Sequence, residues 1–350
     1  VPDPDVNDIV TFVPQSSTAG LYGTLTLNAN GSYVYVLNNS SAAVQGLGPG
    51  ESVTDTFAYA VSDGHGGTAA STLTLTINGT NDAPTVGTAS ASIGEEAAGP
   101  TNALSGLLPT PYDADIRDTV SFVPQTNRAG TWGTLTLRAD GTYTYALTDS
   151  AALHSLGAGQ IAYDTFAYTV ADNHGASVSN TLTITVIGVN DAPSVASATA
   201  SVQEDTLLTA SGILPAPHDP DAHDTVSFLP QNGTPGAYGT FTLHTDGTWS
   251  YDLDNNLYAV QSLGAGETLT DTFTYTVTDN HGAIGSNTLT VTINGTNDAP
   301  TMSLAAAAFA RTDLTLTGVL PPPHDPDAHD TASYQPLTAQ AGLYGTLTLN

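Results

Sequence analysis

The stretch Gly79-Thr80-Asn81-Asp82-Ala83-Pro84 returns as Gly188-Val189-Asn190-Asp191-Ala192-Pro193 and as Gly295-Thr296-Asn297-Asp298-Ala299-Pro300. The three copies follow one another at steps of 109 and 107 residues, which is the length of a sandwich domain rather than of a short solenoid repeat. Each copy ends a Thr-rich alternating segment with a proline, whose missing N–H and fixed φ stop a strand. The motif therefore predicts the joints of a tandem array. Its Asn-Asp pair also offers carbonyl and carboxylate oxygens to a hard cation.

The joints divide the chain into four predicted repeats, residues 1–84, 85–193, 194–300 and 301–350. An Asp-x-Asp signature recurs in all four, at Asp3/Asp5, Asp113/Asp115, Asp219/Asp221 and Asp325/Asp327. By this alignment we expect the first repeat to lack its N-terminal strands. We expect residues 301–350 to be the N-terminal half of a further repeat, so that the sequence is a window on a longer array.

Apolar and polar residues alternate in several segments of 194–300, as in 273–277 and 289–293, which predicts β-structure. Hairpin turns are predicted at Asn30-Gly31, Asp140-Gly141 and Asp246-Gly247. We expect about seven strands per repeat, an immunoglobulin-like sandwich with its aromatic residues in the core, and one helical turn in 258–264. By its phase, the segment 304–309 is predicted to be the first strand of the last repeat. The strands expected in 194–300 are 197–202, 207–214, 225–228, the two strands of the hairpin at 246–247, and two strands around 273–277 and 289–293.

The charge is strongly acidic, with 28 Asp, 5 Glu, 4 Arg and no Lys, for a net charge of −29. Nucleic acid and anionic membrane surfaces both require a basic partner, so we expect neither. The sequence has no run of 18 apolar residues, so we expect no membrane insertion. Such a chain repels itself unless counter-charge binds, and Asp is the carboxylate of many metal-binding loops. A solvated acidic surface is the alternative, but it does not explain why the Asp recur at one phase. The chain has no Cys, which excludes disulfides and thiolate metal sites.

Four acidic signals recur at fixed phase in the repeats. They are an early acid, the Asp-x-Asp signature, an Asp before the aromatic strand, and an Asp in an Asp-x-His-Gly turn. An insertion at 97–100 shifts the early acid of the second repeat relative to its strand. The early acids are Glu95 or Glu96 and Glu204 or Asp205; the third signal is Asp55, Asp164 and Asp271; the fourth is Asp63, Asp172 and Asp279.

These signals, with the Phe-x-Tyr-x-Val-x-Asp segment and the Asn-Asp-Ala-Pro ending, resemble the cadherin repeat. They resemble more closely its bacterial relatives, the VCBS repeats of very large secreted (RTX-type) adhesins. The resemblance covers the whole chain. It implies calcium between successive domains, held by the early acid, a mid-domain acid and the joint of one domain. The next domain would contribute its Asp-x-Asp and the Asp before the Gly turn.

Carried over by position, the resemblance implies three sets of calcium ligands. The first set is Asn81 and Asp82, with Asp55 as a further candidate, against Asp113, Asp115 and Asp172. The second set is Glu95 or Glu96, Asn190 and Asp191, with Asp164 as a further candidate, against Asp219, Asp221 and Asp279. The third set is Glu204 or Asp205, Asn297 and Asp298, with Asp271 as a further candidate, against Asp325 and Asp327.

We therefore interpret the chain as calcium-rigidified extender repeats of a long extracellular bacterial adhesin or biofilm protein, arranged as an extended rod at the cell surface. Its partners would be the neighbouring repeats. The sequence shows no Ser-His-Asp order, phosphate loop or His-Glu-x-x-His pattern, so we expect no enzyme.

Other interpretations stay open. The repeats could assemble with copies of themselves into a filament, sheath or surface layer, for example with residues 301–350 completing residues 1–84 of the next molecule. A glycan-binding module would need an exposed aromatic patch that one repeat has and the others lack, and Trp132 and Trp249 do not fit this. A transition-metal site at His218 and His223 is a weaker alternative, because the second repeat lacks this pair.

Overall fold

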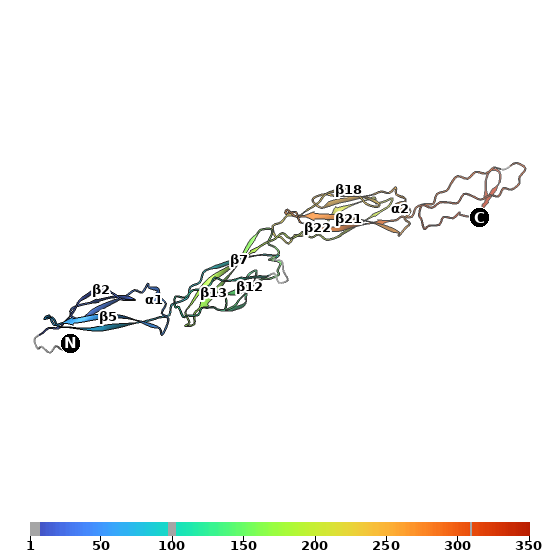
Figure 1. Cartoon of the computed structure of the whole chain (residues 1–350). Helices are drawn as coiled ribbons and strands as arrows, with labels where there is room; N and C mark the ends of the chain where they lie inside the picture. Colours follow the sequence, from blue (N-terminus) through green and yellow to red (C-terminus); the bar gives the residue numbers. More distant parts are fainter. Residues whose placement is uncertain (1–7, 97–102, 309) are drawn as a thin grey trace. The chain divides into compact units, whose positions relative to one another are not determined.

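A computed structural model of the chain describes residues 8–96, 103–308 and 310–350. The predicted Asp3/Asp5 signature, the insertion at 97–100 and Phe309 lie outside the described residues. The chain divides into two compact units, Val1–Val189 and Asn190–Asn350, and each is described by itself. Figure 1 labels the principal strands and the two short helices.

The first unit begins with a domain built from two three-stranded sheets, ordered β1-β5-β6 and β2-β3-β4. The long strands β5 and β6 pair antiparallel over their entire length, and Figure 1 shows β2 in the opposite layer to β5, with α1 at one end. The elements are β1 (Thr11–Phe12), β2 (Gln15–Ala19), β3 (Gly23–Leu27), β4 (Tyr33–Leu37), α1 (Ala42–Gln45), β5 (Ser52–Ser62) and β6 (Thr68–Asn78).

The second domain of this unit has two four-stranded sheets, ordered β7-β14-β13-β9 and β10-β11-β12-β8. Its first strand, β7, pairs in parallel with its last, β14, so that the two ends of the domain lie in one sheet. The strands are β7 (Ala89–Gly94), β8 (Ala103–Leu107), β9 (Ser121–Phe122), β10 (Gln125–Ala129), β11 (Gly133–Leu137), β12 (Thr142–Leu147), β13 (Ile161–Ala171) and β14 (Ser177–Ile187).

The second unit repeats this topology, with sheets β15-β22-β21-β17 and β16-β20-β19-β18. The segment after it contains one hairpin, in which β23 pairs with β24. The elements are β15 (Ala198–Gln203), β16 (Thr209–Ile213), β17 (Ser227–Phe228), β18 (Gln231–Pro235), β19 (Gly239–Leu243), β20 (Thr248–Leu253), α2 (Tyr258–Gln261), β21 (Thr268–Thr278), β22 (Ile284–Asn294), β23 (Leu337–Ala341) and β24 (Thr346–Leu349).

The three predicted hairpin turns are confirmed between β3 and β4, β11 and β12, and β19 and β20. Their glycines, Gly31, Gly141 and Gly247, have φ of 82°, 85° and 85°, the left-handed region that side chains rarely adopt. A Cβ at Gly141 would also lie only 2.6 Å from the Phe122 ring. Two separate constraints therefore require glycine at this turn.

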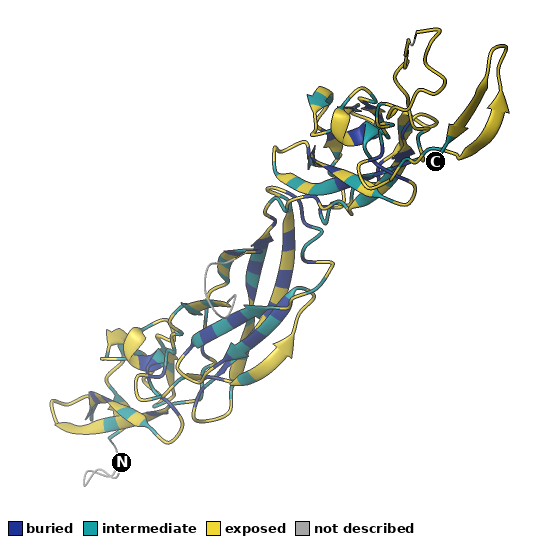
Figure 2. Ribbon diagram, turned by 90° about the vertical axis from the view of Figure 1, so that its right-hand side faces the viewer, coloured by how far each residue is buried: buried dark blue, intermediate teal, exposed yellow. Residues whose placement is uncertain are grey.

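The core of each complete sandwich lies between its two sheets. Along β13, buried and exposed positions alternate, with Phe166, Tyr168 and Val170 at most 1% exposed. Figure 2 shows this alternation as bands along the long strands. The predicted core role is confirmed for the aromatic residues at 249, 251, 273 and 275, whereas Tyr33 is 49% exposed; Trp132 packs against the core. The predicted all-β sandwich class is confirmed.

One strand was not predicted, and one predicted strand does not form. Residues 194–300 contain eight strands, consistent with the expected number of about seven, and the unpredicted one is β18. It is polar, lies at a sheet edge and carries a register shift between Gln231 and Thr234, so it shows no alternation. No strand forms over the described residues 304–308. The equivalent strands β7 and β15 each pair with the last long strand of their own domain, and the described residues of 301–350 include no such strand.

Candidate metal sites at the repeat joints

The first joint lies within the first unit and is built around Asp115. The Asp82 N–H donates to Asp115 Oδ2 at 2.8 Å, and the Asp115 N–H donates to Asp113 Oδ1 at 3.0 Å. The Asn81 side chain donates from Nδ2 to Asp172 Oδ2 at 3.0 Å. The resemblance assigned six residues to this joint. The structure brings together five of them, and Asp55 is the exception.

Several oxygens of this cluster accept no hydrogen bond. Asn81 Oδ1, Asp113 Oδ2 and Asp115 Oδ1 are buried, and none has a donor among the described residues. Asp115 itself is 2% exposed. A buried carboxylate oxygen without a donor is unfavourable in the folded state unless a cation binds it. The cluster therefore has the chemistry of a cation site.

Asp118 extends this cluster, although it was not among the predicted ligands. One carboxylate oxygen from each of Asp113, Asp118 and Asp172 lies within 4.8 Å of the others. Asp118 Oδ2 also lies 2.9 Å from His174 Nδ1. The spacing Asp-x-Asp-x-x-Asp, common to all four repeats, is the sequence signal that could have identified this position.

The electrostatics of the cluster differ between its members. Burial, with the nearby Asp115, Asp118 and Asp172 carboxylates, raises the pKa of Asp113 above its ordinary value. Burial also acts to raise the pKa of Asp172, but hydrogen bonds from Asn81 and from three backbone N–H groups outweigh it, and the pKa is lowered. A bound cation would favour the ionised form of both.

The second unit opens with the same geometry. The Asp191 N–H donates to Asp221 Oδ2 at 2.9 Å, and the Asp221 N–H donates to Asp219 Oδ1 at 3.0 Å. Asn190 Nδ2 donates to Asp279 Oδ2 at 2.9 Å. The buried oxygens Asn190 Oδ1, Asp219 Oδ2 and Asp221 Oδ1 accept no hydrogen bond among the described residues. Asp219, Asp221 and Asp224 each place an oxygen within 4.8 Å of the others, so Asp224 repeats the role of Asp118.

The third joint also lies within the second unit. The Asp298 N–H donates to Asp327 Oδ2 at 3.0 Å, and the Asp327 N–H donates to Asp325 Oδ1 at 3.3 Å. The Thr296 N–H donates to Glu204 Oε1 at 2.8 Å. Glu204 is fully buried, and its Oε2 and Asp327 Oδ1 accept no hydrogen bond among the described residues. Burial and the acids around it raise the pKa of Glu204.

Asp205 approaches this joint from the position after Glu204. Hydrogen bonds from Asn255 and Gln261 lower the pKa of Asp205, while burial and the neighbouring Asp205 carboxylate raise that of Asp298. Asn297 Nδ2 donates to the Asp298 carbonyl at 2.9 Å. The Asp205 and Asp298 carboxyl groups therefore meet at this joint, and a cation would relieve the repulsion between them when both are ionised.

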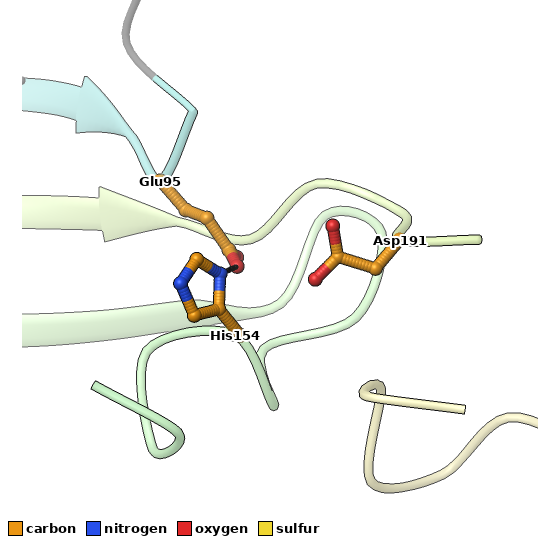
Figure 3. A group of neighbouring side chains, drawn as sticks. All are labelled: Glu95, His154 and Asp191. Carbon is orange, nitrogen blue, oxygen red and sulfur yellow. Dashed lines mark ion pairs between the residues drawn. The ribbon is translucent and has the colours of Figure 1, made fainter. Parts of the chain in front are cut away.

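The early acids of the second repeat differ from each other. Glu95 is 1% exposed, and its Oε2 accepts a hydrogen bond from the Val189 N–H at 3.3 Å. Its Oε1 lies 3.4 Å from His154 Nδ1, and Figure 3 shows the carboxylate directed at the ring. Glu96 is exposed. Of the two alternatives at this position, Glu95 is the buried one.

The three mid-domain candidates, Asp55, Asp164 and Asp271, accept hydrogen bonds inside their own domains. The Asp55 carboxylate accepts hydrogen bonds from the Leu21 and Tyr22 N–H groups and from the Tyr35 hydroxyl, all within its own domain. No hydrogen bond in the described part of the chain connects these aspartates to a joint residue. Their sequence position suggested joint ligands, but the structure gives them protein donors instead. Asp164 and Asp271 repeat the arrangement, with Tyr145 and Tyr251 as the hydroxyl donors.

The model of the bacterial cadherin-like domain matches residues 1–79, 81–188 and 190–295. The chain belongs to this family. The predicted resemblance to cadherin repeats is therefore confirmed, as is the tandem arrangement of cadherin-like domains.

Two kinds of relative accompany the family match. The calcium-binding lectin RapA2 of Rhizobium johnstonii is 30% identical over 182 residues, which cover 49% of the cadherin-like chain and 74% of RapA2. The mouse cadherin-23 EC22-24 structure is 15% identical, with a TM-score of 0.47, over 84% of this chain and 89% of that one. The mouse protocadherin PcdhgC3 EC1-3 structure is 16% identical, with a TM-score of 0.45, over 81% and 88%.

One further finding concerns the described residues of the cadherin-like chain. None of their helices has the length and apolar character needed to cross a membrane.

Proposed function

We propose that the chain is a run of calcium-binding extender repeats from an extracellular adhesin-type protein of the bacterial cell surface. One observation carries the proposal. Asp115, Asp221 and Asp327 are each 2% exposed, and each has one carboxylate oxygen bound by a joint backbone N–H while the other accepts no hydrogen bond among the described residues. The same half-satisfied aspartate at three successive joints indicates a common ligand.

Calcium is the ion that fits this set of donors. It takes six to eight oxygen ligands from carboxylates, carbonyls and water, and the clusters offer oxygen almost exclusively. The net charge of −29 also requires counter-charge close to the protein. The residues that would hold the ions are Asn81, Asp82, Asp113, Asp115, Asp118 and Asp172; Asn190, Asp191, Asp219, Asp221, Asp224 and Asp279; and Glu204, Asp205, Asn297, Asp298, Asp325 and Asp327.

The proposed mechanical role follows from where these ligands originate. At the first joint, Asn81 and Asp82 end one repeat, while Asp113, Asp115 and Asp172 belong to the next. An ion bound by both groups would resist bending at the joint, because bending would break its coordination. Calcium would thus stiffen the array of repeats 1–84, 85–193, 194–300 and 301–350, and its removal would soften it.

Family and relative support the biological setting. Cadherin-like domains are adhesion-type modules, and RapA2 is a calcium-binding lectin. Extracellular fluids are rich in calcium compared with the cytoplasm. Because the ion would bind only the folded joints, secretion into calcium would favour folding outside the cell. The proposal assigns the chain no catalytic role.

Small-angle scattering in saturating calcium and then in chelator tests the extender function. We expect a larger maximum dimension with calcium, and a broader distribution of dimensions after chelation. The triple variant Asp115→Asn, Asp221→Asn and Asp327→Asn should give the chelated profile in both conditions. A wild-type profile that does not change with calcium would contradict the extender role. A calcium-driven doubling of mass would favour filament assembly instead.

One observation favours a second function, glycan binding. Tyr163 on β13 is 60% exposed beside Ile161, which is 56% exposed, and the equivalent residues at position 163 are Thr54 and Thr270. An exposed aromatic ring that only one repeat carries can stack on a sugar, and the relative RapA2 is a lectin. Glycan-array binding that Tyr163→Thr abolishes would support this function, and equal binding by both proteins would exclude Tyr163 from it.

A further inference from the structure

The second repeat departs from its neighbours at two positions that lie beside Glu95. His154 stands where the first and third repeats have Gln45 and Gln261. Asp149 lies in a turn that is one residue shorter in this repeat, where the others have Asn39-Ser40 and Asn255-Asn256. Both changes replace a neutral residue by one that can bind a metal ion or orient a residue that does. They occur together in one repeat.

The two residues contact each other and the buried acid. Asp149 Oδ1 lies 2.8 Å from His154 Nε2, on the outer side of the ring. His154 Nδ1 lies 3.4 Å from Glu95 Oε1 on the inner side. Figure 3 shows the Glu95 side chain reaching the ring. The Glu95 side chain is fully buried and its other oxygen is held by the Val189 N–H. The ring therefore lies between a surface carboxylate and a buried one.

The two contacts divide the roles of the ring nitrogens. A short contact to a carboxylate on Nε2 places a proton there, which leaves Nδ1 as the nitrogen that faces Glu95 Oε1 and can bind a metal ion. A tetrahedral Zn²⁺ with bonds of about 2.0–2.1 Å to nitrogen and oxygen would hold these two atoms about 3.3 Å apart. The observed 3.4 Å separation agrees with this geometry.

We propose that Glu95 and His154 form a site for a borderline transition-metal ion such as Zn²⁺, with the Asp149 carboxylate orienting the imidazole from its far side. A carboxylate on the outer nitrogen of a metal-binding histidine is the usual arrangement, and it increases the basicity of the ligand. Water completes the coordination. Imidazole is a ligand for zinc, copper and nickel, whereas calcium prefers oxygen, so this site differs in kind from the joint sites. Glu95 is one of the calcium ligands that the sequence resemblance implies, but the zinc site does not require calcium.

The third repeat offers a natural comparison. There Gln261 Nε2 donates to Asp205 Oδ1 at 3.1 Å, and Glu204 is the buried acid equivalent to Glu95. An amide nitrogen carries no lone pair for a metal, so this repeat has no counterpart of the His154–Glu95 pair. Exchanging His154 and Gln261 should therefore transfer the metal site from the second repeat to the third.

Calorimetric titration of the full 350-residue chain with ZnCl₂ in millimolar CaCl₂ tests the proposal. We expect His154→Gln to bind one equivalent of Zn²⁺ fewer than the wild type, and Gln261→His to bind one more. Asp149→Asn should retain the equivalent with a several-fold weaker affinity. The matched substitutions cancel any binding by the other eight histidines. Equal zinc stoichiometry in the wild type and His154→Gln would overturn the proposal, and would indicate instead an imidazolium ring bridging two carboxylates.

Two controls keep this result interpretable. Circular dichroism melting should show all three variants folded, since His154 is 41% exposed and glutamine occurs naturally at its position. Calcium titration of His154→Gln should give the wild-type stoichiometry. Loss of the zinc difference with calcium binding intact would overturn the zinc site alone, whereas absence of calcium binding in the wild type would overturn the joint proposal alone.

Discussion

Asp164 and Asp115 are almost equally buried, at 3% and 2% exposed, yet their surroundings are opposite. Asp164 accepts hydrogen bonds from the N–H groups of residues 131, 132 and 133 and from the Tyr145 hydroxyl, so both of its oxygens are satisfied. Asp115 accepts one N–H on Oδ2 and, among the described residues, none on Oδ1. The Asp164 carboxylate therefore has hydrogen-bond donors for both oxygens, whereas Asp115 Oδ1 is buried without one among the described residues.

This difference separates two uses of one residue type. The donors to Asp164 come from a loop of its own domain, and Gly130 leaves room for it, since a Cβ there would lie 2.2 Å from Asp164 Oδ2. The donor to Asp115 is Asp82, from the preceding repeat. Aspartates of the first kind stabilise a domain, and those of the second kind are suited to connect two domains through an ion.

The largest expected effect is on the stability of a single domain. Asp164→Asn would replace a fully hydrogen-bonded carboxylate by an amide that cannot accept all four donors. We expect it to lower the free energy of unfolding of its domain by about 3 kcal/mol, equally with calcium and with chelator. Urea unfolding followed by Trp132 fluorescence in a Trp249→Phe background measures this. A loss that calcium restores would place Asp164 with the joint aspartates and remove the distinction.

A slightly smaller effect, with a different dependence, is expected at the joint. At free calcium 100-fold above its Kd, a bound ion stabilises the folded state by about 2.7 kcal/mol, and Asp115→Asn should lose that contribution. In chelator the same variant should be at least as stable as the wild type, because it removes one charge from a repulsive cluster. Calorimetric melting in both conditions tests this. Destabilisation of similar size in chelator would show that Asp115 is structural.

The stability of the first domain should depend on pH through Asp55, an aspartate whose hydrogen-bond donors lie within its own domain. Burial acts to raise the pKa of Asp55, but hydrogen bonds from Leu21, Tyr22 and Tyr35 outweigh it and the pKa is lowered. Its contribution is therefore present above about pH 4 and lost as pH falls through the lowered value. Burial and Asp55 raise the pKa of Tyr35 from 10.0 to about 12, so stability should also fall as pH rises between these values.

Melting of the wild type and of Tyr35→Phe across this range measures the alkaline limb. The phenylalanine variant should lose this part of the alkaline decline, because no hydroxyl is left to ionise. An unchanged alkaline limb in Tyr35→Phe would contradict the assignment.

The smallest expected effect concerns a contact that needs no ion. Arg117 Nε lies 2.9 Å from Glu51 Oε1 across the first joint, with side chains 84% and 21% exposed. Exposed pairs of this kind contribute less than about 1 kcal/mol and weaken with salt. A double-mutant cycle with Glu51→Gln and Arg117→Gln should give a coupling within that limit that disappears in high salt. A larger, salt-resistant coupling would mean that the joint is held mainly by direct protein contacts.

Much of the fold could be predicted because its local signals agree. The hairpin glycines and the alternating long strands follow from backbone geometry and burial, which act within a few residues. The edge strand β18 could not, since pairing with β19 and not its own pattern makes it a strand. Residues 304–308 show the opposite case. Their sequence aligns with that of a strand in the other repeats, but without a neighbouring strand to pair with they form none.

The sites show a similar limit. Recurrence at fixed phase predicted Asp113, Asp115 and Asp172 as joint residues, but it could not distinguish them from Asp55, which recurs equally well. What separates them is the number of N–H and O–H groups that reach each carboxylate, and those donors lie about 30 residues away in sequence. Asp118 was not predicted, because the resemblance assigns ligand roles only to the first two acids of the Asp-x-Asp-x-x-Asp spacing.

Calcium binding by equilibrium dialysis, compared among the wild type, Asp115→Asn, Asp221→Asn and Asp164→Asn, tests the central claim most directly. Folding of each variant should be verified by circular dichroism under the dialysis conditions. The account predicts that each joint variant loses the ions of one joint, while folded Asp164→Asn retains the wild-type stoichiometry. Undiminished binding in both joint variants, or no binding by the wild type, would contradict it.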